Sequence, residues 1–127
     1  MRLLLDTHLV LWWQAGSSKL PSKSISLVEQ ADVVFVSRAT LWEVAIKVSI
    51  GKLKLDLEKF CYNVDKTGFQ WLDIKKTHLI TVASLPTSDA HKDPFDRLLI
   101  AQSQSEPLLL LTADQQLVHY GEMVKIL

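Results

Sequence analysis

Short apolar runs alternate with segments of helical periodicity along the whole chain, and this alternation limits the possible folds more than any other feature. The runs predicted as strands are residues 2–5, 33–36, 69–74, 108–111 and 124–126. Helices are predicted at residues 7–15, 21–31, 38–50, 57–67, 76–85 and 94–105, with a short helix before the last strand. Strands that alternate with helices form a mostly parallel sheet joined by right-handed crossovers. We therefore expect an α/β fold, a three-layer sandwich with a mostly parallel central sheet.

Length and composition are typical of one globular domain, which we expect to span residues 1–127. The chain is 48% hydrophobic and 22% charged, and its formal net charge is zero. Tight nucleic-acid binders usually carry a basic surplus, so the balance argues against a simple nucleic-acid-binding module. Cys61 is the single cysteine and has no internal disulfide partner. No secretory signal or bilayer-length apolar run is evident, and we expect a cytoplasmic protein that does not enter the membrane.

The segment from Asp93 onward has the pattern of a helix start. Pro94 suits the first helical position, which makes Asp93 the N-cap and places Asp96 three residues later. An apolar stripe that includes Leu98 and Leu99 follows, so the body of the helix is expected to be buried. First-turn acids often only satisfy free N–H groups and the helix dipole. That structural role suffices for Asp93, which remains a secondary site candidate, but not for Asp96.

Three other acids are expected at the same edge of the sheet as Asp96. Asp6 directly follows the first strand, Glu43 lies early in the helix after the 33–36 strand, and Asp114 comes shortly after the 108–111 strand. In open parallel sheets, sites form at the carboxyl ends of the strands. The topology therefore predicts that four acids, far apart in the sequence, meet at one rim.

Gathered carboxylates predict a cation, because like charges packed together repel and raise one another's pKa. Oxygen ligands around an open site suit a hard ion, Mg²⁺ or alternatively Mn²⁺. Such a site supports hydrolysis of phosphodiester bonds. We expect Asp6 and Asp96 to be direct ligands, with Asp114 and Glu43 acting through water or a second ion, and Thr112 orienting a ligand or a water.

Two other interpretations of these residues stay open. Glu43 and Lys47 are spaced as an exposed helical ion pair, which contributes only about 0.3–0.5 kcal/mol. His8, or His91 with Asp93, would suit a zinc site, but the helical histidine pair typical of zinc hydrolases is absent. We expect His78 and His119 to be ordinary, partly exposed side chains.

Four segments together resemble the PIN-domain nucleases, and most of all the VapC-like toxins of type II toxin–antitoxin modules. The segments are residues 3–8 (LLLDTH), 41–47 (LWEVAIK), 93–102 (DPFDRLLIAQ) and 111–114 (LTAD), in the family's order. The resemblance implies a Mg²⁺-dependent endoribonuclease whose four site acids are Asp6, Glu43, Asp96 and Asp114. It also implies a homodimer, an RNA substrate and inhibition by a cognate antitoxin protein. Arg97 and Lys47 are candidates for holding the carboxylates or contacting RNA, with a structural ion pair as the alternative.

Two other functions compete with a nuclease. One is an Asp-based phosphotransfer enzyme with Asp6 as nucleophile, although a dehalogenase-type site would place a second acid where His8 stands. The other is a non-catalytic regulatory module that keeps the fold. It ranks last because four gathered acids without a cation are unfavourable.

Overall fold

Five parallel strands form a single sheet in the computed structural model, which describes residues 1–87 and 93–127. The strands are β1 (Arg2–Leu5), β2 (Val33–Ser37), β3 (Gln70–Leu72), β4 (Leu109–Thr112) and β5 (Val124–Ile126). Their order in the sheet is β3-β2-β1-β4-β5, and every neighbouring pair is parallel. β1 and β4 are therefore direct neighbours although about a hundred residues separate them in the sequence.

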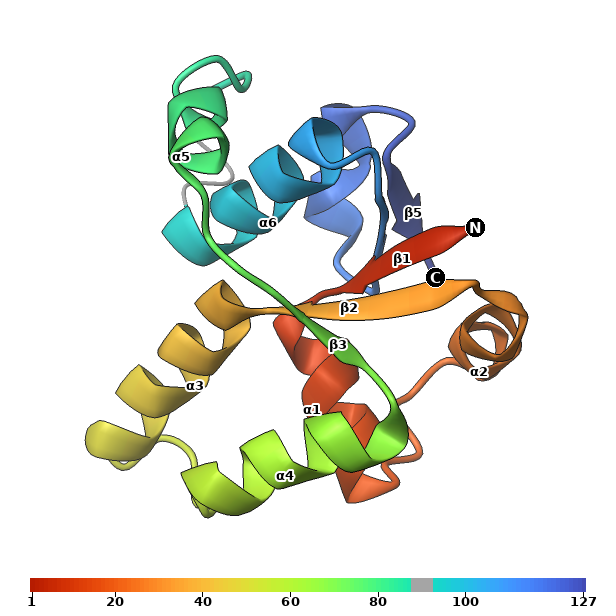
Figure 1. Ribbon diagram of the computed structural model, residues 1–127, viewed down its shortest axis with the longest axis vertical. Coiled ribbons are helices and arrows are strands. Elements are labelled where there is room, and N and C mark those ends of the chain that lie inside the picture. The colour runs from red at the N-terminus through yellow and green to blue at the C-terminus, as the bar shows by residue number, and fades with distance from the viewer. Residues whose placement is uncertain (88–92) are drawn as a thin grey trace.

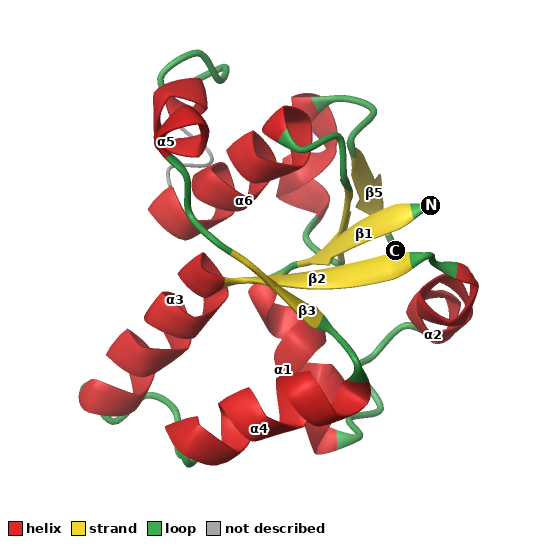
Figure 2. Cartoon of the chain, in the orientation of Figure 1, coloured by secondary structure: helices red, strands yellow, loops and turns green. Residues whose placement is uncertain are grey.

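Helices cover both faces of this sheet, which confirms the expected three-layer α/β fold. They are α1 (Thr7–Ala15), α2 (Ser22–Gln30), α3 (Arg38–Ser49), α4 (Leu57–Thr67), α5 (Lys76–Val82), α6 (Pro94–Ser105) and the 3-10 helix η1 (Gln115–Tyr120). Figures 1 and 2 show α5, α6 and η1 on one side of the sheet, with α1, α2 and α4 on the other. α3 begins where β2 ends, and α6 begins at the same edge (Figure 1).

Two apolar cores lie on the two faces of the sheet, because successive strand residues point to opposite sides. Leu4 of β1 packs in the core under α6, and Leu3 and Leu5 pack in the core against α1 and α4. All three side chains are buried. Continuous apolar strands of this kind are typical of a parallel sheet covered on both faces.

Several predicted boundaries differ from the structure by a residue or more, and backbone hydrogen bonds explain three of them. The strand predicted at residues 69–74 is only β3, because the Phe69 N–H is used in the turn that ends α4. The helix predicted to reach residue 85 ends at Val82, where the following N–H groups bond three residues back instead of four. The fourth strand lies one residue later than predicted, because the Leu108 N–H bonds to the Ser103 carbonyl after α6.

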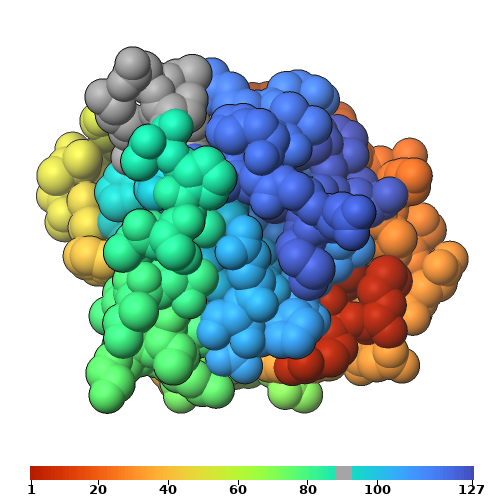
Figure 3. Space-filling view, turned by 90° about the horizontal axis from the view of Figure 1, so that it is seen from above, coloured from red at the N-terminus to blue at the C-terminus, as the bar shows by residue number. Residues whose placement is uncertain are grey.

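Arg97 and the C-terminal segment hold together the face that contains α5 and α6. In Figure 3 these helices and the C-terminal part of the chain lie side by side. The Arg97 guanidinium donates to the carbonyl oxygens of Pro86 (2.8 Å) and Val82 (3.4 Å) and to the Tyr120 hydroxyl (3.1 Å). These hydrogen bonds give Arg97 a structural role, and within residues 1–87 and 93–127 its guanidinium forms no ion pair. Within residues 1–87 and 93–127, none of the helices is long and apolar enough to cross a bilayer.

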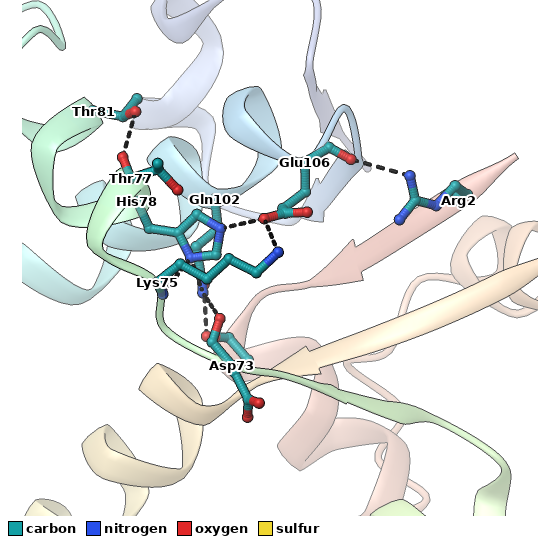
Figure 4. Close-up of polar contacts among 9 residues, drawn as sticks. Arg2, Asp73, Lys75, Thr77, His78, Thr81, Gln102 and Glu106 are labelled. Carbon is teal, nitrogen blue, oxygen red and sulfur yellow. Dashed lines mark hydrogen bonds and ion pairs between the residues drawn. The ribbon is translucent and has the colours of Figure 1, made fainter.

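His78 is completely buried, so its predicted partial exposure is wrong. Its Nδ1 accepts the Lys75 backbone N–H at 3.0 Å, which leaves the ring proton on Nε2, 2.6 Å from Glu106 Oε2 (Figure 4). The Gln102 amide lies 3.3 Å from the same Nδ1, and Lys75 Nζ pairs with Glu106 at 3.1 Å. The hydrogen bond from His78, followed by that from Lys75, lowers the pKa of Glu106. His78 therefore joins α5 to the end of α6.

Replacing His78 with Leu is expected to lower the free energy of unfolding by about 1–3 kcal/mol, because the Lys75 N–H and the Gln102 amide lose a buried acceptor. Urea denaturation followed by circular dichroism measures this loss. His119→Leu is the matched control, because His119 is exposed, and a change within about 0.5 kcal/mol is expected there. Equal losses in the two variants would contradict the structural role given to His78.

Candidate active site

Asp6 lies at the junction of β1 and α1, and both of its carboxylate oxygens are engaged. Oδ1 accepts the Leu9 N–H at 2.9 Å and so caps α1, while Oδ2 accepts the Thr112 hydroxyl at 2.5 Å. The side chain is buried. Burial raises the pKa of Asp6, and the Asp114 charge adds to this, whereas the Thr112 bond, the Leu9 N–H and His8 oppose it.

Thr112 joins Asp6 to Asp114 across two neighbouring strands. It is the last residue of β4, is wholly buried, and also accepts the Asp114 backbone N–H at 3.0 Å. The Asp114 carboxylate accepts the Gln116 N–H at 2.9 Å and caps η1. The Thr112 hydroxyl therefore donates to the Asp6 carboxylate and accepts from the Asp114 backbone N–H, which is how it can orient both acids.

Glu43 is buried in α3, so an exposed helical pair with Lys47 does not describe it. The pair itself is present, with Lys47 Nζ 2.9 Å from Oε2, and the Thr7 hydroxyl donates to Oε1 at 2.7 Å. Thr7 has a single hydroxyl proton, so the Thr40 hydroxyl, 3.2 Å away, is the donor in their contact. Glu43 is thus held from α1 on one side and by a cation of its own helix on the other.

The pKa of Asp96 is affected by all three other acids of the rim. Asp96 lies in the first turn of α6, and its backbone N–H donates to Asp93 Oδ1 at 3.0 Å. Its pKa is raised to about 7, first by burial and then by the negative charges of Asp93, Asp6, Glu43 and Asp114, in that order. Asp6, Glu43 and Asp114 are therefore near enough to Asp96, at the carboxyl edge of the sheet, for their charges to act on it.

Asp93 is the N-cap of α6, as predicted. Its Oδ1 accepts the N–H groups of Phe95 (2.9 Å) and Asp96 (3.0 Å), and the side chain is exposed. The structural role given to it therefore has a direct basis. Its charge still reaches the site, because it is the largest electrostatic contribution to the pKa of Asp96.

The acids lie at one edge of the sheet, but in the described part of the chain they do not form a single ligand shell. Among residues 1–87 and 93–127, no three histidine, cysteine, aspartate or glutamate side chains are close enough to hold one metal ion together. His91 of the zinc alternative lies outside the described residues. The arrangement suits an ion that keeps most of its water, because Mg²⁺ is commonly bound through only one or two carboxylates.

A pocket of about 180 Å³ opens beside the acids. It is lined by Asp6, His8, Trp12, Ala113 and Asp114. Sequence reasoning did not identify this pocket, although one signal was available. His8 and Trp12 are four residues apart on one helix, a spacing that places both side chains on the same face.

The chain belongs to the PIN domain family, whose sequence model matches residues 3–123. It is 26% identical over 124 residues to Ribonuclease VapC22 of Mycobacterium tuberculosis, covering 91% of this chain and 88% of that protein. Its fold is similar to a chain of VapBC2 from Rickettsia felis bound to a promoter DNA fragment (TM-score 0.72, 15% identity, 99% and 98% of the two chains). It is also similar to a chain of a toxin–antitoxin complex from Klebsiella pneumoniae (TM-score 0.69, 17% identity, 97% and 95%).

Replacing Thr112 with Val is expected to lower the free energy of unfolding by about 1.5–3 kcal/mol, because a buried hydrogen bond to the Asp6 carboxylate is lost. Urea denaturation without divalent ions measures the loss. Thr112→Ser keeps the hydroxyl and should recover most of it. A Val variant as stable as the parent would show that this hydrogen bond does not stabilise the rim.

The raised pKa of Asp96 predicts how stability depends on pH. The folded protein holds this proton up to a pH of about 7, whereas an unperturbed aspartate loses it near 3.8. This contribution to stability is therefore complete below about pH 4 and is lost as the pH rises to 7. Asp96→Asn cannot lose a proton, so without divalent ions its advantage over the parent should grow from pH 4 to 7 and then level off.

Thermal unfolding in EDTA at several pH values measures this advantage. Asp56→Asn is the matched control, since it removes an exposed carboxylate that caps another helix, α4, and Asn caps equally well. Its effect should be small and similar at every pH. An Asp96→Asn advantage that does not change with pH would mean that Asp96 is not under the influence of the other acids.

Proposed function

We propose that this protein is a metal-dependent endoribonuclease and the toxin of a type II toxin–antitoxin pair. The observation that carries the proposal is the placement of Asp6, Glu43, Asp96 and Asp114 at the carboxyl edge of the sheet, where burial, and after it the charges of the neighbouring acids, raises the pKa of Asp96 to about 7. Membership of the PIN domain family and the similarity to a protein named Ribonuclease VapC22 support the same activity.

The donor set fits Mg²⁺, with Mn²⁺ as a substitute. Every candidate ligand is a carboxylate oxygen, and hard ions prefer oxygen. When bound, the ion would supply the positive charge that an acidic site needs to accept a phosphodiester and stabilise its hydrolysis. Asp6 and Asp96 are the proposed direct ligands. Asp114 and Glu43 would complete the site through water or a second ion.

The surrounding residues would keep the carboxylates in fixed orientations. Thr112 and the Leu9 N–H hold the two oxygens of Asp6, and Thr7 and Lys47 hold those of Glu43. Groups fixed before the substrate arrives need no reorganisation during the reaction. We therefore assign Thr7, Thr112 and Lys47 as positioning residues and Arg97 as structural.

We further propose a cognate antitoxin as the inhibitor, a homodimer as the working form and the cytoplasm as the site of action. Solved structures of this fold include toxin–antitoxin complexes from Rickettsia felis and Klebsiella pneumoniae, which supports the antitoxin. An antitoxin that offers a basic side chain to the rim would offset the same negative charge that Mg²⁺ is proposed to offset.

Asp96→Asn is expected to lower RNA cleavage by about 100-fold or more while the protein stays folded, because a metal ligand contributes several kcal/mol to the stabilisation of the transition state. Cleavage of labelled transfer and messenger RNAs with Mg²⁺ measures the effect. EDTA should abolish cutting by the parent, and Mg²⁺ or Mn²⁺ should restore it. Asp56→Asn should cut like the parent.

The same proteins separate the alternatives. A metal-dependent rise in melting temperature is expected for the parent and should be much smaller for Asp96→Asn. A non-catalytic module predicts no cutting of any RNA, and a phosphotransfer enzyme predicts a phosphoryl group trapped on Asp6. If Asp96→Asn cuts as well as the parent, the site assignment is wrong.

A further inference from the structure

We propose that the pocket lined by His8 and Trp12 receives an unstacked nucleobase of single-stranded RNA, next to the bond that is cut. This inference rests on the proposed ribonuclease function and specifies the form of its substrate. The pocket is lined by residues from two places in the fold: α1 with the residue that caps it, and the turn after β4.

The aromatic wall of the pocket comes from a single helix face. The rings of His8 and Trp12 are one turn apart on α1, with centroids 5.7 Å apart and planes tilted by 38°. His8 is exposed and Trp12 is half-buried, so the pair presents ring surface to solvent. Trp13, the next residue, packs edge-on against Phe69 instead and takes no part in this wall.

The remaining walls favour a flat, neutral ring with N–H groups over a phosphate. Asp6 and Asp114 contribute negative charge, which repels a phosphate that carries only acceptors. Nucleobases offer a π-face for stacking and amino or ring N–H donors that a carboxylate can accept. Ala113 adds only a small methyl group on the β4 side, which leaves the volume open for such a ring.

The position of the pocket links base binding to the site of cutting. Asp6 and Asp114 line the pocket and are also two of the four acids of the proposed site. A base held against Trp12 therefore leaves the adjoining phosphodiester beside the acidic rim. A base in a duplex is already stacked and paired, so this pocket selects single strands, loops and bulges. Stacking accepts every base, so the pocket selects by strandedness more than by sequence.

Abasic substitution combined with Trp12 variants tests the inference. Take a short single-stranded RNA that the parent cuts at one bond, and replace each base near that bond in turn with an abasic ribose. One position should raise KM by about tenfold, because stacking on an aromatic contributes about 1–3 kcal/mol per base. Trp12→Leu should raise KM similarly on the intact RNA, and the two changes together should do no more than either alone. Trp12→Phe should stay within about threefold of the parent.

Matched controls separate stacking from a loss of folding. Trp71→Leu removes a tryptophan that bonds to Asp65, away from the pocket, and should leave KM unchanged. Circular dichroism verifies that each variant is folded. The inference is wrong if Trp12→Leu has the KM of the parent, or if Trp12→Phe raises KM as much as Trp12→Leu does. It is also wrong if the abasic and Trp12→Leu effects on KM multiply independently, or if duplex RNA is cut as well as single-stranded RNA.

A binding measurement without cleavage separates this inference from the proposed function. In the Asp96→Asn protein with Mg²⁺, single-stranded RNA should quench tryptophan fluorescence, and adding Trp12→Phe should remove that quenching. If the parent cuts no RNA but this quenching occurs, the nuclease proposal fails and the base-binding pocket stands. If the parent cuts RNA but the quenching is absent or does not depend on Trp12, the pocket assignment fails alone.

Discussion

Negative charge held in a partly buried space is the constraint on which the rest of this structure depends. The parallel sheet brings Asp6 and Asp114 to the ends of neighbouring strands, and α3 and α6 begin at the same edge. Buried carboxylates without compensation are strongly unfavourable. The fold compensates with the Thr112 hydroxyl and backbone N–H groups at Asp6, and with Lys47 at Glu43. Burial and the charges of the neighbouring acids nevertheless raise the pKa of Asp96 to about 7.

Several acids of the rim also form the starts of helices, so local folding and the site use the same atoms. Asp6 caps α1, Asp93 caps α6 and Asp114 caps η1. A helix N-terminus carries a partial positive charge, which makes it a favourable location for a carboxylate. Each cap therefore fixes the direction of a helix and at the same time brings negative charge to the edge of the sheet. The capping signals in the sequence are for this reason also signals of the site.

The features predictable from the sequence are those set by local pattern and topology. Apolar runs and capping residues define the strands and helices, and the parallel order then brings Asp6, Glu43, Asp96 and Asp114 to one edge. Tertiary contacts decide the rest. His78 resembles a surface residue in sequence, but it is buried and its ring bonds to Glu106, 28 residues later. The contact from Thr7 to Glu43 spans 36 residues, and the one from Thr112 to Asp6 spans 106, so neither has a local signature.

The acids of the rim differ in how far neighbouring groups offset their negative charge. This difference affects where a metal ion would bind. Glu43 already has Lys47 at 2.9 Å and a hydroxyl at 2.7 Å, so its need for a further cation is small. In the described part of the chain, the groups that donate to the two oxygens of Asp6, the Leu9 N–H and the Thr112 hydroxyl, are neutral, and the pKa of Asp96 is about 7. We therefore propose that the ion lies nearer to Asp6 and Asp96 than to Glu43. The proposed ion belongs on that side, with Lys47 serving as a built-in cation on the other.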